Sequence, residues 1–330
     1  MKQFLQKKAK LVFLCMLVLL TCTACANPRG RDGKTLADQI IASEETTIDA
    51  SKINYKDISD KKLKKEIKKN IKDGQYTIQP TTFKNSMSKG WFEGLIVWPI
   101  AQIINLISSK TDAGVGIILT TLLIQMLVCV FTRKSQMSTQ RMQEIQPEIQ
   151  KIQNKYKDKT DERSKMQMAQ EMQNIYQKYD IHPFGSMLIT FIQLPIMMGM
   201  YYATMRSVSV VSGSFMGISL AGTPLDGFKA FDIAYISIYV LMVIFYIVSM
   251  KLPQWLKKWQ DKKDNVKVKK YAQEETNPMA NSMNMSMYFM TAMICIMYIS
   301  WPMAMSFYWL VSSVIRVCQS LILHKVMNKK

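Results

Sequence analysis

The sequence predicts an all-α membrane protein: five transmembrane helices around a hydrophilic groove, with an outer amphipathic surface helix and a cytoplasmic helical hairpin. Three observations support this fold class: long apolar blocks, an uneven distribution of lysine and arginine between them, and polar residues at helical spacing inside them. A helix of about 20 residues crosses the hydrocarbon core of a bilayer, so each long apolar block predicts a span. The blocks lie at roughly 114–132, 184–205, 233–250, 284–302 and 303–323, and none contains Asp or Glu.

Residues 1–24 contain the three regions of a lipoprotein-type signal peptide in the usual order. A basic start precedes the apolar run LVFLCMLVLL and then small residues, a pattern typical of a cleaved export signal rather than of a span. Thr23-Ala24-Cys25 resembles a bacterial lipobox, so we predict that Cys25 is lipidated and becomes the mature N-terminus outside the cell. Cys22 stands where that motif usually has Leu or another aliphatic residue, which leaves an ordinary signal peptide as the alternative.

Two further segments precede the first span. Residues 25–84 are polar and Lys-rich, and we expect an extracellular, solvated and partly helical spacer rather than a specific binding face. Residues 85–112 are predicted to form an amphipathic interfacial helix on the outer surface of the membrane, with Trp91 and Trp98 in the headgroup layer. The apolar residues of this helix recur at helical spacing: Phe92, Ile96, Ile100, Ile103 and Ile107.

The distribution of lysine and arginine predicts the orientation of the spans, because short loops rich in these residues stay in the cytoplasm. Segment 133–182 contains ten of them and segment 251–283 contains eight, whereas 207–231 contains only Lys229. We therefore predict an outside N-terminus and a cytoplasmic C-terminus. The segments are transmembrane helices at 113–132, 184–206, 232–250, 284–302 and 303–323, a cytoplasmic helical hairpin at 133–183, an extracellular loop at 207–231, a cytoplasmic basic loop at 251–283 and a cytoplasmic basic tail at 324–330.

The 133–183 segment carries two amphipathic helical patterns joined by a turn. One stripe contains Ile145, Ile152 and Tyr156, and the other contains Met168, Met172, Ile175 and Tyr179. We expect Thr160 to cap the second helix, and Pro147 to kink the first helix or to begin a new one. Two short amphipathic helices with a tight turn between them predict an antiparallel hairpin.

Polar, mostly uncharged residues recur on the helical faces of three spans. They are Thr121, Gln125 and Thr132 in the first span, Ser186, Thr190, Gln193 and Thr204 in the second, and Tyr308, Ser312, Arg316 and Gln319 in the fifth. Each could simply form hydrogen bonds between helices. Three such stripes, one of them with an arginine, nevertheless predict a wet groove within the bundle. The absence of carboxylates from the apolar blocks argues against a transporter coupled to protons or cations.

Arg316 is the one charged residue of these stripes. An arginine at the centre of a span costs about 2.5–3.5 kcal/mol on insertion scales, so it should face water or a partner. At about 1.5 Å per residue it lies about 20 Å below an outer boundary near Met303, and Gln125 lies about 16 Å below one near Gly114. Both therefore lie near the middle of a core about 30 Å thick. The alternative is that Arg316 extends to the cytoplasmic interface.

Composition excludes several other classes of protein. The six cysteines and two histidines show neither a disulfide framework nor metal-ligand spacing. The sequence has no Gly-rich phosphate loop, so we expect no ATP hydrolysis, no cofactor and no catalytic residue. The formal charge of +19 could indicate nucleic acid. Five spans exclude a soluble nucleic-acid binder, and we expect the lipid bilayer as a partner and no sequence-specific nucleic-acid binding.

Three runs of the sequence resemble the YidC family of membrane insertases, in the Oxa-type superfamily. TRKSQMSTQRMQEIQPEIQKIQNKY is similar to the start of the family's cytoplasmic hairpin, YDIHPFGSMLITFIQLPI to the start of its second span, and SFYWLVSSVIRVCQS to its last span. The resemblance covers about 88–325, in order. The short extracellular part resembles the lipoprotein form found in bacteria with a single membrane.

The resemblance implies an insertase that works without ATP, alone or with the Sec translocon. A nascent membrane protein would place its polar flank in a groove that is open to the cytoplasm and the lipid, and its apolar segment would slide into the bilayer. The ribosome or the signal recognition particle receptor is a further possible partner. The residues expected to contact the substrate in the groove are Thr121, Gln125, Thr190, Gln193, Tyr308, Ser312, Arg316 and Gln319. The alternative function is a channel or a lipid scramblase that uses the same groove.

Two expectations about particular residues follow from the resemblance. The family usually has an arginine in the first span, where this sequence has Gln125, so we expect Arg316 to supply the positive charge of the groove. The hairpin is thought to receive substrates, and methionine makes adaptable binding surfaces, so we expect Met168 and Met172 to recruit them. The alternative is that these methionines only join the two helices of the hairpin.

Overall fold

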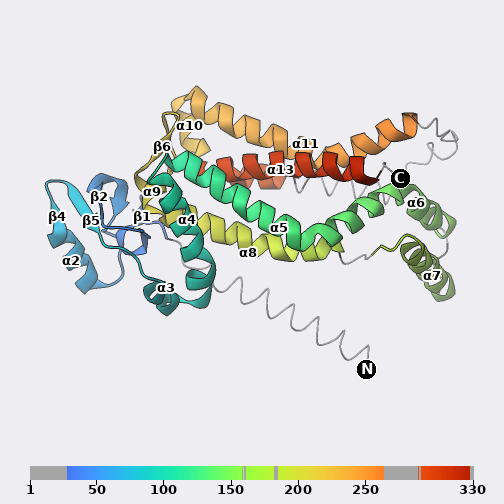
Figure 1. The fold of residues 1–330 in the computed structure, drawn as a ribbon, viewed down its shortest axis with the longest axis horizontal. Coiled ribbons are helices and arrows are strands. Elements are labelled where there is room, and N and C mark those ends of the chain that lie inside the picture. Colours follow the sequence, from blue (N-terminus) through green and yellow to red (C-terminus); the bar gives the residue numbers. More distant parts are fainter. Residues whose placement is uncertain are drawn as a thin grey trace. The chain divides into compact units, whose positions relative to one another are not determined.

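The computed structural model describes residues 28–157, 159, 161–181, 185–263, 289 and 291–327. Most of these residues are helical (Figure 1). They form two compact units. Unit one contains the described residues up to Thr120, Gln193–Asp226 and Pro302–Tyr308, and unit two contains those of Thr121–Ile192, Gly227–Trp301 and from Trp309 onward. The predicted signal peptide with Cys25, most of the predicted basic loop and the last residues of the predicted tail lie outside this described part.

Residues 35–80 of unit one form a small fold of short strands and helices. β2 (Thr46–Asp49), β5 (Gln75–Ile78) and β4 (Ile71–Lys72) make an antiparallel sheet in that order, and β1 (Thr35–Leu36) pairs in parallel with β3 (Ile53–Asn54). Two single turns, η1 (Ala37–Gln39) and η2 (Ala50–Lys52), follow β1 and β2. α2 (Lys61–Asn70) begins at Asp60, whose side chain accepts hydrogen bonds from the backbone N–H groups of Lys62 and Leu63.

This small fold shares a hydrophobic core with two valines that follow α8, so the expectation of a solvated spacer is wrong. The buried core residues are Ala37, Ile40, Ala42, Ile48, Ile53, Ile58, Ile67, Ile78, Val208 and Val211. Most of them stand singly between polar residues in the sequence, and only the pairing of strands brings them together. α2 contributes Ile67 from its inner face, while its lysine-rich outer face is exposed. The strands were not predicted.

Hydrogen bonds fix the small fold to the helices of unit one. Beside the end of α8 (Gly185–Arg206), Ile41 N donates to Arg206 O at 2.6 Å, and Val208 N donates to Ile41 O at 3.0 Å. The Asn105 side chain of α4 (Trp98–Ser108) donates to the Ile41 carbonyl at 2.8 Å and accepts from Ser207 Oγ at 2.6 Å. The N-terminal segment is therefore an integral part of unit one.

The predicted surface helix consists of three pieces: α3 (Phe83–Lys89), a π-helical turn η3 (Glu93–Val97) and α4. Its faces differ from the predicted ones. Phe92 and Ile100 of the predicted apolar stripe are buried within unit one, whereas Trp91, Leu95 and Leu106 are exposed. The segment therefore has two apolar faces. One packs on the protein, and the other is exposed.

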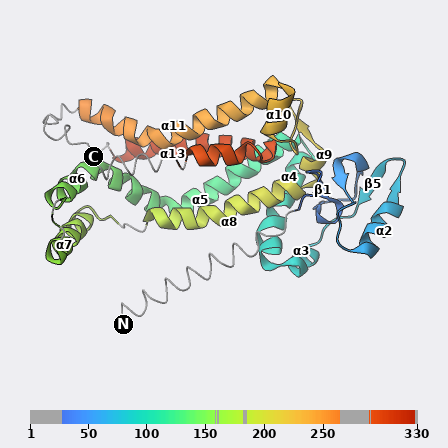
Figure 2. The ribbon, with the colours of Figure 1, turned by 180° about the vertical axis from the view of Figure 1, so that it is seen from behind.

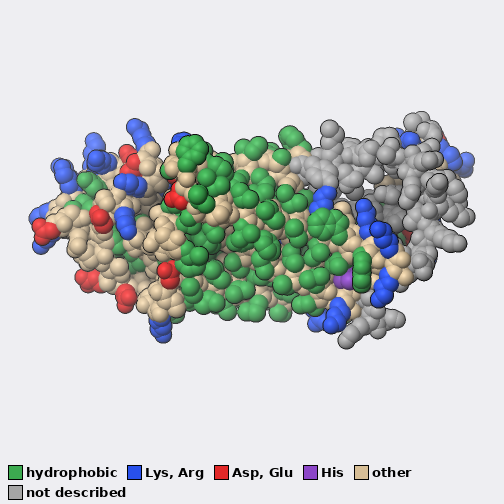
Figure 3. Space-filling view, turned by 90° about the horizontal axis from the view of Figure 1, so that it is seen from above, with side chains coloured by type: hydrophobic (Ala, Val, Ile, Leu, Met, Phe, Trp, Pro, Cys, Tyr) green, Lys and Arg blue, Asp and Glu red, His purple; other side chains and the backbone are tan. Residues whose placement is uncertain are grey.

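Three described helices are long and apolar enough to cross a membrane: Ala113–Met142, Ile233–Gln260 and Met303–Val326. They lie within α5 (Ala113–Glu144), α11 (Ile233–Lys263) and α13 (Met303–Met327). Figure 3 shows hydrophobic side chains gathered on one face of the molecule, and the exposed residues of α11 include Val240, Leu241 and Ile244. These findings confirm a mostly helical membrane protein.

The count of five spans stays a prediction. α8 coincides with the predicted second span and contains Pro195. The predicted fourth span lies partly outside the described residues, and residues 291–298 of it are helical. α5 and α11 continue as helices past the predicted span ends at 132 and 250.

The segment between α8 and α11 is tied to the start of α13 within unit one. It contains α9 (Val208–Ser212), a hairpin of β6 (Ser214–Phe215) and β7 (Ile218–Ser219), and α10 (Pro224–Ala230). Met303 N donates to Gly222 O at 2.7 Å, and Ala304 N donates to Leu220 O at 3.1 Å. These bonds satisfy two backbone donors at the start of α13 that have no partner inside the helix.

In unit two, α6 (Gln146–Lys155) and α7 (Glu162–Lys178) lie side by side (Figures 1 and 2). Tyr156 OH donates to Glu171 at 2.9 Å and Tyr179 OH donates to Glu148 at 2.6 Å, so the two helices run in opposite directions. A proline stands in the first turn of α6, as predicted for the start of a new helix. The predicted cap of α7 is wrong by one residue, because the Asp161 side chain accepts from Ser164 N at 2.8 Å.

Candidate functional site

A polar pair joins α5 and α13 inside unit two. Gln125 Nε2 donates to Ser312 Oγ at 3.0 Å, and both side chains are buried. Thr121, one turn before Gln125 on α5, is fully buried as well. Burying an amide or a hydroxyl between apolar helices costs free energy unless the group forms a hydrogen bond. Here the Gln125 amide and the Ser312 hydroxyl bond to each other. The structure therefore brings together three of the residues that the sequence analysis assigned to a groove.

Arg316 lies one turn after Ser312 on α13, and its side chain points toward the N-terminal end of that helix. Its Nη2 donates to Ser313 Oγ at 3.1 Å, and its Cζ lies 5.7 Å from the centroid of the Trp309 ring. Both contacts are with residues earlier in α13, as expected from the lean of helical side chains toward the N-terminus. The alternative, in which Arg316 extends to the cytoplasmic interface, requires its side chain to point toward the C-terminal end of α13 instead.

Aromatic rings from two other segments of unit two surround Trp309. The Tyr298 ring stacks on it with centroids 4.9 Å apart and planes at 27°. The Tyr246 ring of α11 meets it edge-on, with centroids 6.3 Å apart. These three residues were not among those predicted from the sequence. The spacing of Trp309 and Arg316, two helical turns apart on one face, was a signal that could have pointed to the first of them.

A second polar pair lies in unit one. Gln193 Nε2 of α8 donates to Tyr308 OH of α13 at 3.0 Å, and Tyr308 is fully buried. The side chain of Thr190 lies outside the described part of the structure. Gln319 is half-buried on α13, one turn beyond Arg316. Four of the eight predicted groove residues thus form two pairs, each inside one unit.

Met168 and Met172 both lie on α7 and are half-buried. Met172 packs against the cluster of Ile145 and Ile149, at the start of α6, and Ile181, which follows the end of α7. The alternative prediction, that these methionines only join the two helices of the hairpin, expects this contact for Met172. Met166, by contrast, is largely exposed on the same helix.

An ion pair that the sequence analysis missed holds unit one together. The guanidinium of Arg206, at the end of α8, contacts the Glu93 carboxylate of η3, and both side chains are largely buried. Arg206 Nε also donates to Gln39 O at 2.8 Å. Burial, with the charge of Arg206 nearby, lowers the pKa of the neighbouring Lys89. Because the two partners are far apart in the sequence and each resembles an ordinary charged residue, no local pattern indicates the pair.

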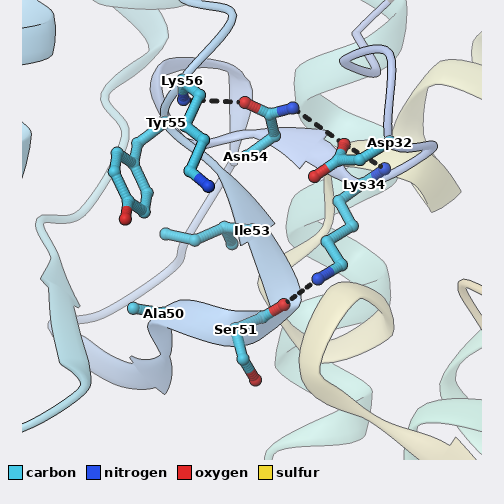
Figure 4. A pocket seen from close by; sticks show the side chains of 8 residues that line it. All are labelled: Asp32, Lys34, Ala50, Ser51, Ile53, Asn54, Tyr55 and Lys56. Carbon is cyan, nitrogen blue, oxygen red and sulfur yellow. Dashed lines mark hydrogen bonds between the residues drawn. The ribbon is translucent and has the colours of Figure 1, made fainter.

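A pocket of about 170 Å³ lies in the small N-terminal fold (Figure 4). Its lining residues are Asp32, Lys34, Ala50, Ser51, Ile53, Asn54, Tyr55 and Lys56. The polar groups bond to one another: Lys34 Nζ donates to Ser51 O at 2.5 Å, and Asn54 Nδ2 donates to Asp32 at 2.8 Å. These bonds stabilise the loops around the pocket, and they belong to local structure rather than to a ligand site. Among the described residues, no three His, Cys, Asp or Glu side chains gather as metal ligands.

Comparison with known proteins gives consistent matches. The sequence profile of the family described as 60Kd inner membrane protein matches residues 105–330. Membrane protein insertase YidC 1 of Streptococcus pyogenes serotype M6 is 30% identical over 237 residues, 72% of this chain and 75% of that protein. Membrane protein insertase MisCA of Bacillus subtilis is 27% identical over 238 residues, 72% of this chain and 80% of that protein. Membrane protein insertase YidC of Oceanobacillus iheyensis is 28% identical over 245 residues, 74% of this chain and 87% of that protein.

Proposed function

This chain belongs to the 60Kd inner membrane protein family, and we propose on that basis that it inserts and folds integral membrane proteins into the plasma membrane without ATP. The relatives that it matches over most of their length are named membrane protein insertases. The observation that carries the proposal to particular residues is the buried polar pair between Gln125 and Ser312, with Arg316 one turn away. Burying polar groups among apolar helices costs free energy. Water or a polar segment of a substrate lowers this cost by forming hydrogen bonds with them.

In this proposal the polar residues of α5, α8 and α13 line a hydrophilic groove. The polar flank of a nascent membrane protein enters it from the cytoplasm, and the apolar segment moves into lipid, where the hydrophobic effect stabilises it. The hydroxyl and amide groups exchange hydrogen bonds with the guest, so that no covalent step and no nucleotide are needed. Nascent membrane proteins are the substrates, and the Sec translocon, the ribosome and the signal recognition particle receptor are candidate partners.

Arg316 supplies the positive charge of the groove. A guanidinium near mid-membrane attracts acidic flanks of incoming segments and keeps water in the groove. The contacts with Trp309 and Ser313 support this role, because they turn the side chain toward the N-terminal end of α13.

The proposed topology has five spans, a lipidated Cys25 outside and the C-terminus in the cytoplasm. The surface helix would lie in the outer interface, and the exposed Trp91, Leu95 and Leu106 supply an apolar face suited to it. Mass spectrometry of the mature N-terminus tests the anchor: an unmodified start beyond Cys25 would contradict it.

The hairpin of α6 and α7 is proposed to receive substrates on the cytoplasmic side. The exposed Met166 and the half-buried Met168 offer an adaptable apolar surface. Replacing residues 134–180 with a short linker should leave a folded protein that inserts poorly, since the groove would remain but capture would be lost. Normal insertion by the shortened protein would refute the recruitment role.

Complementation and reconstitution together test the function. Expression of the chain in an insertase-depleted bacterium should restore growth. Reconstituted in liposomes, it should insert a small single-span substrate without nucleotide. A channel or a lipid scramblase would instead conduct ions or exchange lipids in the absence of any substrate, and such flux without insertion would favour that alternative.

A further inference from the structure

The position of the Arg316 charge is set by an aromatic ring. Trp309 lies seven residues earlier on α13, on the same face, and the Arg316 Cζ is 5.7 Å from its centroid. A cation over an indole face is attracted by the ring quadrupole, and Trp is the strongest of the three aromatic side chains in this respect. The hydrogen bond from Nη2 to Ser313 Oγ, at 3.1 Å, holds the guanidinium from a second side.

The Trp309 ring is itself held by its neighbours. It is 7% exposed, stacked on Tyr298 at 4.9 Å and met edge-on by Tyr246 at 6.3 Å. These two tyrosines come from the helical residues 291–298 and from α11, so three separate segments of unit two meet at this ring. Ring pairs of this geometry add to the energy of packing. A ring fixed on two sides cannot turn away, and it offers Arg316 one stable surface.

We propose that Trp309, with Tyr298 stacked on it, is a positioning residue that holds the Arg316 guanidinium where it selects substrates with acidic flanks. This rests on the proposed role of Arg316 in the groove. The ring attracts the cation and carries no net charge itself.

The test measures selectivity, so that a general loss of folding does not decide it. Two versions of one single-span substrate, with two Asp or two Asn in the translocated flank, are inserted into liposomes by the full chain. The measured quantity is the ratio of acidic to neutral insertion, which is unaffected by the fraction of active protein. The variants are Trp309→Leu, Trp309→Phe, Arg316→Gln and the double variant Trp309→Leu with Arg316→Gln.

Trp301→Leu is the matched control. Trp301 also packs on Tyr298, with centroids 5.0 Å apart, so its loss removes an indole from the same tyrosine. A purely structural role of the aromatic cluster would make both tryptophans equivalent. A positioning role makes only Trp309 matter for the ratio.

We expect Trp309→Leu to lower the acidic preference by about threefold to tenfold, the size of a partly desolvated cation–π contact. Trp309→Phe should fall between it and the unaltered protein, Trp301→Leu should keep the ratio, and the double variant should match Arg316→Gln. An unchanged ratio in Trp309→Leu, or in Trp309→Phe if the leucine variant does not fold, overturns the inference, and so does an equal fall in Trp301→Leu. An unchanged ratio in Arg316→Gln overturns the proposed role of Arg316 instead.

Discussion

Arg206 in unit one and Arg316 in unit two are both turned away from bulk water, but their surroundings differ in kind. Arg206 is 4% exposed, contacts the Glu93 carboxylate and donates to the Gln39 carbonyl at 2.8 Å. Arg316 is half-buried, lies over the Trp309 ring and donates to Ser313 Oγ at 3.1 Å. Arg206 is held by a carboxylate, whereas Arg316 is oriented by an aromatic ring and a hydroxyl.

This difference separates a structural charge from the charge that is proposed to bind substrates. A buried ion pair with further hydrogen bonds ties three elements of unit one together: α8, η3 and the small N-terminal fold. Its net charge is zero, so it attracts no distant ion. The apolar block 303–323 that contains Arg316 has no Asp or Glu in the sequence, so the side-chain charge of that block is positive. In the proposed function, this charge attracts the acidic flank of a substrate.

The largest effect on stability should come from breaking the ion pair of unit one. Arg206→Met should lower the free energy of unfolding by about 3–5 kcal/mol, because it leaves the Glu93 carboxylate buried and uncompensated. Adding Glu93→Leu should recover most of this loss, since a well-packed apolar pair can replace a buried ion pair. Thermal unfolding in detergent measures both.

The matched control for this prediction is Arg141→Met. Arg141 lies 3.7 Å from Asp180, and that pair is substantially exposed. Its loss should change the free energy of unfolding by less than about 1 kcal/mol. A double variant less stable than Arg206→Met alone would show that Arg206 acts through contacts other than Glu93.

Arg316→Ala should show the opposite pattern, with insertion abolished and stability changed by only about 0.5–2 kcal/mol, the range of a cation–π contact. The second variant, Arg316→Ala with Gln125→Arg, should restore part of the activity. The reason is local: Gln125 reaches Ser312, one turn from Arg316, so a guanidinium at position 125 would lie at a similar level of unit two. Complementation and liposome insertion measure activity, and unfolding in detergent measures stability.

Two outcomes would contradict this prediction. Full activity of Arg316→Ala would mean that the groove does not depend on this charge. A folded, membrane-inserted double variant without activity would mean that the charge cannot move between the two helices.

The features that the sequence predicted are those that depend on local pattern. Apolar blocks predicted the three helices that are long and apolar enough to cross a membrane, and period-3.6 stripes predicted α6 and α7, because neither needs a distant partner to be recognised. The small N-terminal fold escaped prediction because its strands are two to four residues long and most of its core isoleucines stand singly among polar residues. No period can be read from so few positions.

The polar residues of the spans were visible in the sequence, but their partners were not. Spacing along one helix places Gln125 on a face and says nothing about which residue of another helix stands opposite. The pairing with Ser312, and the stacking of Tyr298 on Trp309, are tertiary contacts between distant segments. The Glu93–Arg206 pair is of the same kind.

The smallest expected effect concerns the exposed ion pair of the hairpin, which has neither the burial of Arg206 nor the ring of Arg316. Lys155 Nζ lies 2.5 Å from Glu171 Oε1, and the Tyr156 hydroxyl donates to the same oxygen at 2.9 Å. The pKa of Glu171 is lowered, mainly by the hydrogen bond from Lys155 and to a smaller extent by the one from Tyr156. A carboxylate whose pKa is lowered on folding contributes stability above its unfolded pKa, and this contribution is lost as the pH falls through the folded value.

Because water and salt screen the exposed pair, Glu171→Gln should destabilise the protein only slightly at neutral pH, and the difference should disappear in acid and at high salt. Unfolding of both proteins across pH and salt measures this, with Tyr156→Phe as the control that keeps the ion pair. A large loss that persists at high salt would place this pair with Arg206 among the structural charges.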